Sequence, residues 1–406
     1  MKKIFSLAFA LLFAVLFTIS ASAVKVDDAS YYAKFKGQNI TLNVYNWGEY
    51  ISNGEDKSVD VIKEFENLTG IHVNYTNYAS NEDLYAKLSS SSAQYDIVIP
   101  SDYMIARMIK ENMLQELNFN NIPNIKYISE KYRKTDFDTT GAYTVPYMWG
   151  TVGIIYNKKY VKEPVDSWNI LWNEKYKGKI LMFSNSRDAF GVALKKLGYS
   201  LNTTNADEIN AAADALKKQK GLVQAYVMDQ VFDKMELEEA YLAPYYAGDA
   251  ITMIEKNKNL AFAYPKEGTN IFIDSICIPK GSKNKEAAEA FINFLCETDI
   301  AVANCECIAY STPHSEALKK LDQKITGNKI AYPDDTVLAN AESFIALPAA
   351  TNSLMDSLWI EIKSGLGDDS TMNSYILPVA IILALAVILL IVVSVFRKYK
   401  KKNNNY

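Results

Sequence analysis

Residues 40–100 alternate between the periodicities of strands and helices, and this pattern limits the fold more than any other feature of the chain. In 40–45 every second side chain is apolar, as in a strand with one buried face. In 59–68 the apolar residues recur at helical spacing, and Gly70 can end that helix. A strand followed by a helix is the beginning of a parallel α/β unit, because parallel neighbours need a crossover connection.

The same unit is then repeated. Residues 71–75 alternate again, and Asn81 can cap a second helix. Residues 95–100 are nearly all apolar, as in a strand that is covered on both faces. Open α/β sheets bind ligands beyond the carboxyl ends of their strands, which is where Trp47 and Ser101 fall.

The rest of the chain continues the pattern. About 350 residues lie between the two terminal segments, which is more than one hydrophobic core usually serves, so we expect two lobes. Further helical patterns occur in 187–197, 206–218, 285–297 and 352–363. The predicted fold class is therefore α/β with two lobes.

The N-terminus has the features of a secretory signal peptide. Two lysines precede an apolar stretch, and small residues follow at the expected cleavage site, so residues 1–23 are predicted to be removed. The mature chain is then extracellular or periplasmic.

The C-terminus is predicted to anchor the chain in a membrane. Residues 375–396 carry no charge and span about 33 Å as a helix, enough to cross the ~30 Å hydrocarbon core. The basic tail 397–406 fits the cytoplasmic side, and 367–374 reads as a short spacer. We expect a single-pass protein of the cell membrane with its folded part outside.

Charge argues against nucleic acid as a partner. The formal net charge is −4, and the two N-terminal lysines with the five cations of the tail account for +7, so the part between them carries −11. An acidic exterior repels nucleic acid and attracts small cations.

Cysteine and histidine spacing predicts no metal site and no cofactor. Cys277, Cys296, Cys305 and Cys307 lie in one stretch, and Cys305 and Cys307 are only one residue apart, unlike the usual zinc knuckle. Buried free thiols or one disulfide are expected, with the pairing left open.

The sequence YNWGEY in 45–50 places aromatic rings and a carboxylate at the end of a predicted strand. Ring faces attract an ammonium group, and a carboxylate accepts its hydrogen bonds. The motif suits an organic cation, although strand packing with one solvated acid explains it equally well.

Several motifs taken together resemble one family. They are 45–50, 78–88, 99–101, 146–150, 264–268 and 283–286. In this order they are similar to the spermidine/putrescine-binding proteins of bacterial ABC importers, over roughly residues 40–366. The resemblance implies a two-lobed periplasmic-binding-protein fold of type II with a hinge. The first lobe would comprise 40–149 and 275–335, and the second 150–274 and 336–366.

The resemblance also implies a binding site for polyamine in the cleft between the lobes. Its residues would be Trp47, Glu49, Tyr50, Ser101, Tyr103, Asp188, Tyr246, Asp249, Phe272, Asp274 and Tyr310. A polyamine alternates ammonium groups with methylenes, so carboxylates and aromatic walls are the side chains it requires. The chain would catalyse nothing and would deliver its ligand to permease subunits. A separate subunit would hydrolyse ATP, because this chain has no phosphate-binding GxxxxGK[ST] motif.

Three positions depart from the family pattern. Gly48 replaces the usual Thr or Ser, Asn185 stands where the spermidine-binding branch has an acid, and Ile345 replaces a polar residue. The last two changes weaken a third ammonium subsite, so the balance leans slightly toward a diamine such as putrescine.

Two other functions remain open from the residues alone. Paired carboxylates in a cleft could serve an anchored glycoside hydrolase. The same fold could also bind another organic cation or an amino acid, whose carboxylate Arg187 could face.

Overall fold

The computed structural model describes residues 24–90 and 94–364 of the 406-residue chain. The predicted signal peptide, spacer, membrane span and basic tail lie outside these residues. Within the two described ranges, none of the helices is both long and apolar enough to cross a membrane.

A three-stranded parallel sheet forms from the first α/β units. Strand β1 (Thr41–Trp47) lies between β2 (His72–Tyr78) and β3 (Ile97–Val98). Val44 of β1 is paired with Tyr75 on one side and Ile97 on the other. The predicted strand, helix, strand order is confirmed, with α3 (Val61–Thr69) and α4 (Asn81–Ser89) as the crossovers.

The ends of these helices test two predicted caps. Gly70 ends α3 with a left-handed φ of 73°, as expected from a residue without Cβ. Asn81 is not the cap of α4. Ser80 takes that role, because it has the extended backbone that a cap requires and its Oγ accepts from the Asp83 amide.

The second sheet has seven strands in the order β10-β9-β4-β7-β5-β6, with β8 paired to β4 outside this path. Their bounds are β4 (Val145–Asn157), β5 (Ile180–Phe183), β6 (Val223–Val227), β7 (Leu242–Tyr246), β8 (Leu260–Ala263), β9 (Thr269–Ile276) and β10 (Ala341–Glu342). β4 runs antiparallel to β7, β8 and β9.

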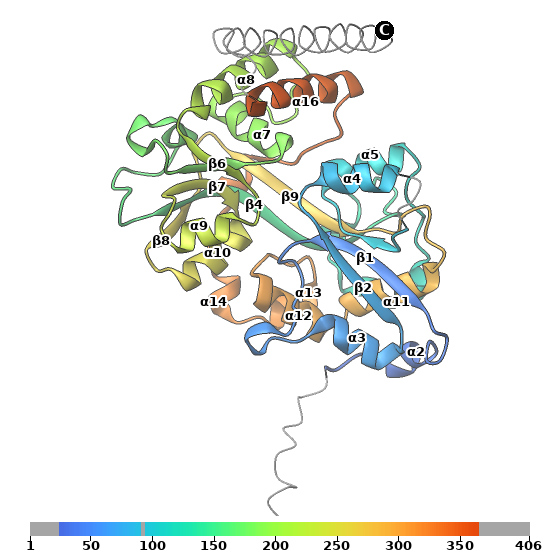
Figure 1. Ribbon diagram of the computed structural model, residues 1–406. Helices are drawn as coiled ribbons and strands as arrows, with labels where there is room; N and C mark the ends of the chain where they lie inside the picture. The colour runs from blue at the N-terminus through green and yellow to red at the C-terminus, as the bar shows by residue number, and fades with distance from the viewer. Residues whose placement is uncertain (1–23, 91–93, 365–406) are drawn as a thin grey trace, which may run out of the picture.

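Strands β4 and β9 pass between the two halves of the molecule (Figure 1). The start of β4 pairs with the end of β9, and the end of β4 pairs with β7 and β8. Cys277, the residue after β9, forms an antiparallel bridge with Val98 of β3. Asp274 of β9 forms a second antiparallel bridge, with Ser101. This pairing brings the edge of the first sheet against β9 and places the ends of β1 and β3 beside the second sheet.

Helices cover both sheets. The others are α2 (Ala29–Ala33), α5 (Asp102–Lys110), α6 (Glu130–Arg133), α7 (Ser186–Lys196), α8 (Ala206–Lys220), α9 (Val231–Glu236), α10 (Ala247–Lys256), α11 (Lys285–Leu295), α12 (Thr298–Ile308), α13 (Ser315–Lys320), α14 (Gln323–Thr326), α15 (Asp335–Leu338) and α16 (Ala349–Ser364). The four helical patterns predicted late in the chain correspond to α7, α8, α11 and α16.

Helices from the C-terminal part of the described chain pack against earlier helices in both halves of the molecule. Phe291 of α11 packs edge-on against Phe65 of α3, with ring centroids 4.9 Å apart. The ring of Trp359 in α16 packs against that of Phe190 in α7, with ring centroids 6.4 Å apart. The four cysteines are free thiols, and three of them are buried in the core.

Candidate ligand-binding site

A cavity of about 610 Å³, partly open to solvent, lies where the ends of β1 and β3 face β9 and the start of α7. Its walls come from both halves of the molecule and combine aromatic rings, carboxylates and amides. The lining residues are Trp47, Gly48, Tyr50, Asn81, Ser101, Asp102, Tyr103, Asp188, Met228, Asp229, Tyr245, Tyr246, Asp249, Asn270, Phe272, Asp274, Tyr310 and Phe344.

Two carboxylates in this cavity are each oriented by a tyrosine. The Tyr50 hydroxyl donates to Asp274 Oδ2 at 2.7 Å, and the Tyr246 hydroxyl donates to Asp188 Oδ2 at 2.7 Å. Asp188 is held further by Asn185, whose Nδ2 donates to the same oxygen at 2.7 Å. The carboxylates are therefore positioned before any ligand arrives.

Burial makes these carboxylates costly to ionise without a cation. Burial is the main cause that raises the pKa of Asp249 to about 8, and the nearby acids, Asp229 first among them, contribute to this increase. Burial likewise raises the pKa of Asp274 to about 6 and raises that of Asp188. The Asp274 Oδ1 atom is buried without a hydrogen-bond partner. A cationic ligand would supply the missing charge and donors.

The aromatic walls are held by their own contacts. The Trp47 indole donates from Nε1 to the Ile99 carbonyl at 2.9 Å. Phe272 lies edge-on to Tyr246 with ring centroids 5.5 Å apart, and Tyr310 lies edge-on to Tyr50 at 5.0 Å. Rings fixed in this way present apolar and π surface to methylenes and ammonium groups.

Ten of the eleven site residues predicted from the sequence line this cavity, and Glu49 is the one that does not. Glu49 lies in the turn after β1 with a φ of 48° and an exposed side chain. Its charge still helps to raise the pKa of Asp249. The structure brings together in one cavity Trp47, Tyr50, Ser101, Tyr103, Asp188, Tyr246, Asp249, Phe272, Asp274 and Tyr310.

Sequence reasoning missed several lining residues. Asp102 is buried, and its Oδ2 has no hydrogen-bond partner. Its position directly after Ser101, at the end of a predicted strand, could have identified it from the sequence. No sequence pattern identifies Asp229 as a lining residue, because only the fold brings it close to Gly48. A Cβ on Gly48 would lie 2.3 Å from Asp229 Oδ2, which explains the missing side chain at this position.

Asn185 and Ile345, which both differ from the family pattern, lie in different places relative to the cavity. Asn185 caps α7, and its Nδ2 donates to the Asp188 carboxylate, so it positions that acid. Ile345 is 47% exposed and does not line the cavity, whereas its neighbour Phe344 does. Arg187 also lies outside the lining, since its guanidinium donates to the Asn202 side chain and the Ile345 carbonyl.

Among the described residues, no group of three or more His, Cys, Asp or Glu side chains could hold a metal ion. The two halves, the cavity between them and its preset carboxylates are the arrangement of a protein that captures a small solute.

Comparison with known proteins identifies the class and the family. A family model described as "Bacterial extracellular solute-binding protein" matches residues 92–335. The spermidine/putrescine-binding periplasmic protein of Escherichia coli strain K12 is 36% identical over 329 residues, covering 80% of this chain and 92% of that protein. The putrescine-binding periplasmic protein SpuD of Pseudomonas aeruginosa is 33% identical over 346 residues, covering 80% and 93%.

A solved structure described as a putative spermidine/putrescine ABC transporter from Listeria monocytogenes superposes with a TM-score of 0.76 at 37% identity, covering 80% of this chain and 98% of that one. The chain therefore belongs to the bacterial extracellular solute-binding proteins, in the family of the spermidine/putrescine-binding periplasmic proteins. The predicted α/β periplasmic-binding-protein fold and family are confirmed. Proteins of this family bind solutes and are not enzymes, so the glycoside hydrolase alternative is wrong.

Proposed function

We propose that this chain captures a polyamine in the cavity and delivers it to the permease subunits of an ABC importer, whose ATPase is a separate subunit. The observation that carries the proposal is the pair of tyrosine-oriented carboxylates, Asp188 and Asp274, which belong to different elements and face one aromatic cavity. Two carboxylates in one cavity with aromatic walls match two ammonium groups joined by methylenes.

The residues of the site divide by role. The carboxylates of Asp188, Asp249 and Asp274 accept the ammonium groups, and Trp47, Phe272 and Tyr310 enclose the methylenes. The remaining lining residues of the predicted set, Tyr50, Ser101, Tyr103 and Tyr246, orient these groups. Glu49 acts at longer range, through its charge.

Ligand binding closes the two lobes about β4 and β9. We assign 40–149 and 275–335 to the first lobe and 150–274 and 336–366 to the second. A ligand that contacts Tyr50 of the first lobe and both Asp188 and Asp274 of the second favours the closed state by its differential affinity.

Putrescine is the preferred ligand in this proposal. Asn185 replaces an acid of the spermidine-binding branch and is engaged with Asp188, so it is not free to accept an ammonium group. A diamine satisfies the two oriented carboxylates without a third subsite.

Calorimetry on the purified full chain in detergent tests the ligand, with putrescine, cadaverine, spermidine, spermine, arginine and glycine betaine as probes. Micromolar or tighter binding of a polyamine, and none of arginine, is the expected result. Absence of heat and of thermal stabilisation with every polyamine at millimolar concentration would contradict the proposal, and arginine or betaine binding would favour another cation.

The proposed location is the cell membrane, with one C-terminal span at 375–396, the folded part outside and the basic tail inside. Membranes from cells that make the full chain, and from cells that make a chain ending at residue 366, distinguish anchored from released protein after alkaline carbonate extraction. Release of the full chain by carbonate would contradict the anchor.

A further inference from the structure

Two smaller hollows adjoin the ligand cavity at the same end. One, of about 520 Å³, shares Tyr103 with the cavity and is lined by Glu82, Arg187 and Asp356 among others. The other, of about 230 Å³, shares Asp188, Asn270 and Phe344 with it. The cavity therefore ends where Tyr103 and Phe344 separate it from further space.

Phe344 is the side chain that fills this boundary. It is 5% exposed, its ring is T-shaped to Tyr103 at 5.8 Å, and the Arg187 guanidinium lies 4.5 Å from its centroid. On its remaining side the ring lies against α7, where a Cβ on Gly191 would come within 3.2 Å of Cζ. The ring is enclosed by contacts on three sides and faces the ligand cavity with the fourth.

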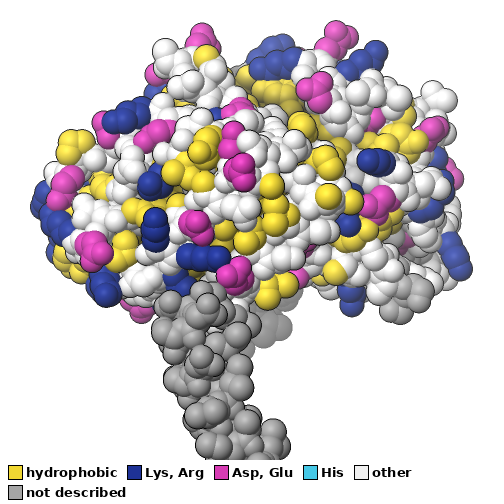
Figure 2. All heavy atoms as spheres, turned by 90° about the horizontal axis from the view of Figure 1, so that it is seen from above, with side chains coloured by type: hydrophobic (Ala, Val, Ile, Leu, Met, Phe, Trp, Pro, Cys, Tyr) yellow, Lys and Arg dark blue, Asp and Glu magenta, His cyan; other side chains and the backbone are white. Residues whose placement is uncertain are grey.

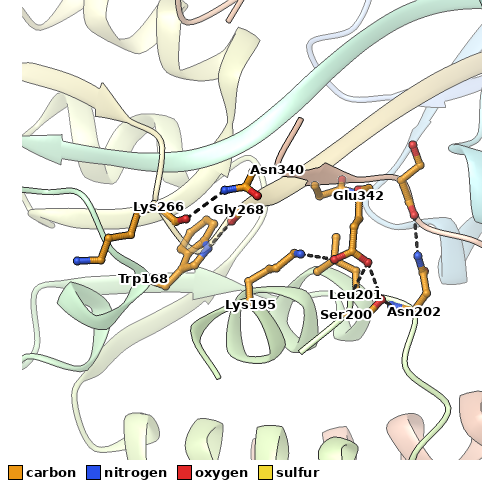
Figure 3. Close-up of polar contacts among 11 residues, drawn as sticks. Trp168, Lys195, Ser200, Leu201, Asn202, Lys266, Gly268, Asn340 and Glu342 are labelled. Atoms are coloured by element: carbon orange, nitrogen blue, oxygen red, sulfur yellow. Dashed lines mark hydrogen bonds and ion pairs between the residues drawn. The ribbon is translucent and has the colours of Figure 1, made fainter. Parts of the chain in front are cut away.

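The short segment that carries Phe344, residues 341–345, is fastened along its length. We call it the strap. Its first residues form β10 beside β9, and the Asn270 Nδ2 donates to the Glu342 carbonyl at 3.0 Å. Lys195, the Ser200 hydroxyl and the Leu201 amide all converge on the Glu342 carboxylate (Figure 3).

The other end of the strap is held by Asn202. Its Nδ2 donates to the Ser343 carbonyl at 2.8 Å, and its Oδ1 accepts from the Ile345 amide at 3.0 Å. Arg187 donates to the same Asn202 oxygen at 2.9 Å and to the Ile345 carbonyl at 3.2 Å. Backbone contacts therefore fix the residues on both sides of Phe344, which leaves its ring little freedom to retreat from the cavity.

Arg187 supports the ring from behind. It is 5% exposed, and its guanidinium lies 4.5 Å from the Phe344 ring centroid. A cation over an aromatic face is attracted to it, so Arg187 helps to hold the ring in place. The ring itself excludes a longer ligand by its volume.

We propose that Phe344, positioned by the strap and backed by Arg187, is the end wall that sets the length of polyamine this site accepts. This inference rests on the proposed polyamine function and adds to it a specificity-determining residue. Removing the ring widens the ligand cavity toward the 230 Å³ hollow, which Phe344 also lines, and the longer spermine chain gains room that putrescine does not use.

The test compares spermine and putrescine affinities by calorimetry on the full chain in detergent, for the wild type, Phe344→Ala and Phe344→Leu. We expect the ratio of spermine to putrescine affinity to rise at least tenfold in Phe344→Ala and by a smaller factor in Phe344→Leu. Glu342→Gln, which loosens the strap while leaving the ring in place, is expected to raise the ratio as well. Ser343→Ala, an exposed strap residue that contacts through its backbone, is the matched control and should leave the ratio within twofold.

Ligand-length selectivity is a readout that a purely structural role would not move. Equal loss of affinity for both ligands in all three variants would overturn the inference, and so would a ratio that stays within twofold in Phe344→Leu and Glu342→Gln if Phe344→Ala fails to fold. Absence of polyamine binding in the wild type would instead refute the proposed function, and this inference would fall with it.

Discussion

The Tyr50 hydroxyl donates a 2.7 Å hydrogen bond to the Asp274 carboxylate, joining the turn after β1 to a residue 224 positions later in β9. Asp274 is buried, and its other oxygen has no partner. One oxygen is thus fixed by the protein, and the second is left for a donor from outside.

This arrangement predicts how much Asp274 contributes to binding. Asp274→Ala should weaken polyamine affinity by about 1.5 to 3 kcal/mol, as for a charge-assisted hydrogen bond lost from a desolvated site. Asp188→Ala should do the same, and both are measured by calorimetry. Asp214→Ala, which removes an exposed acid of α8, is the control for net charge. Unchanged affinity in both cavity variants would show that the ligand binds elsewhere.

The raised pKa values predict that affinity depends on pH. In the empty site Asp249, with a pKa of about 8, is protonated at pH 7, and Asp274, with a pKa of about 6, is partly so. A bound ammonium group favours the ionised form, so binding should release protons. Affinity should then rise with pH from 6 to about 8, by about tenfold per unit for each proton released, while the ligand amines remain charged.

Calorimetry at pH 7 in buffers of different ionisation enthalpy measures that release directly. Asp249→Asn should lower the number of protons released, and Asp214→Ala should not. Binding heats that are independent of the buffer in the wild type would contradict the mechanism.

The raised pKa of Asp249 also predicts that ionising this side chain destabilises the ligand-free protein. The pKa of Asp249 is raised from 3.8 to about 8 in the folded state, so between those values the folded state binds more protons than the unfolded state. The stabilising contribution of the protonated acid is complete below pH 3.8 and is lost as the pH rises to about 8. Without ligand, Asp249→Asn should therefore raise the melting temperature more at pH 8.5 than at pH 5. An identical difference at both values, measured by scanning calorimetry, would contradict the assignment.

Gly48 and Asp229 form a pair whose coupling can be measured. Gly48→Ser would place a Cβ 2.3 Å from Asp229 Oδ2, so one side of the cavity must open, and polyamine affinity should fall by about 1 to 3 kcal/mol. Adding Asp229→Ala removes the clash and should restore part of that loss. The double-mutant cycle is followed by calorimetry, and strictly additive effects would show that the two residues do not meet in the bound state.

Surface charge is consistent with a small ligand rather than a nucleic acid. On the face in Figure 2, acidic and basic side chains of the described residues are interspersed instead of being grouped by sign. Nucleic-acid binding relies on a basic surface that neutralises many phosphates.

Local sequence periodicity predicted much of the fold. Strands β1 to β3 and helices α3 and α4 were predictable because each buries one face against its neighbours, and that face is written into the spacing of a few consecutive residues. The cap of α4 was misassigned by one residue, since Ser80 and Asn81 are both suitable cap types and only the backbone conformation at Ser80 distinguishes them.

The sequence by itself determined the α/β class, the family and most of the residues that line the cavity, because these depend on local periodicity and on motifs that keep their order. Tertiary structure decided which groups meet: the antiparallel passage of β4 and β9 that sets Asp274 beside Ser101, the approach of Asp229 to Gly48, and the strap that turns Phe344 rather than Ile345 toward the cavity. Such contacts join residues tens to hundreds of positions apart. They follow from the packing of whole elements, which no short stretch of sequence encodes.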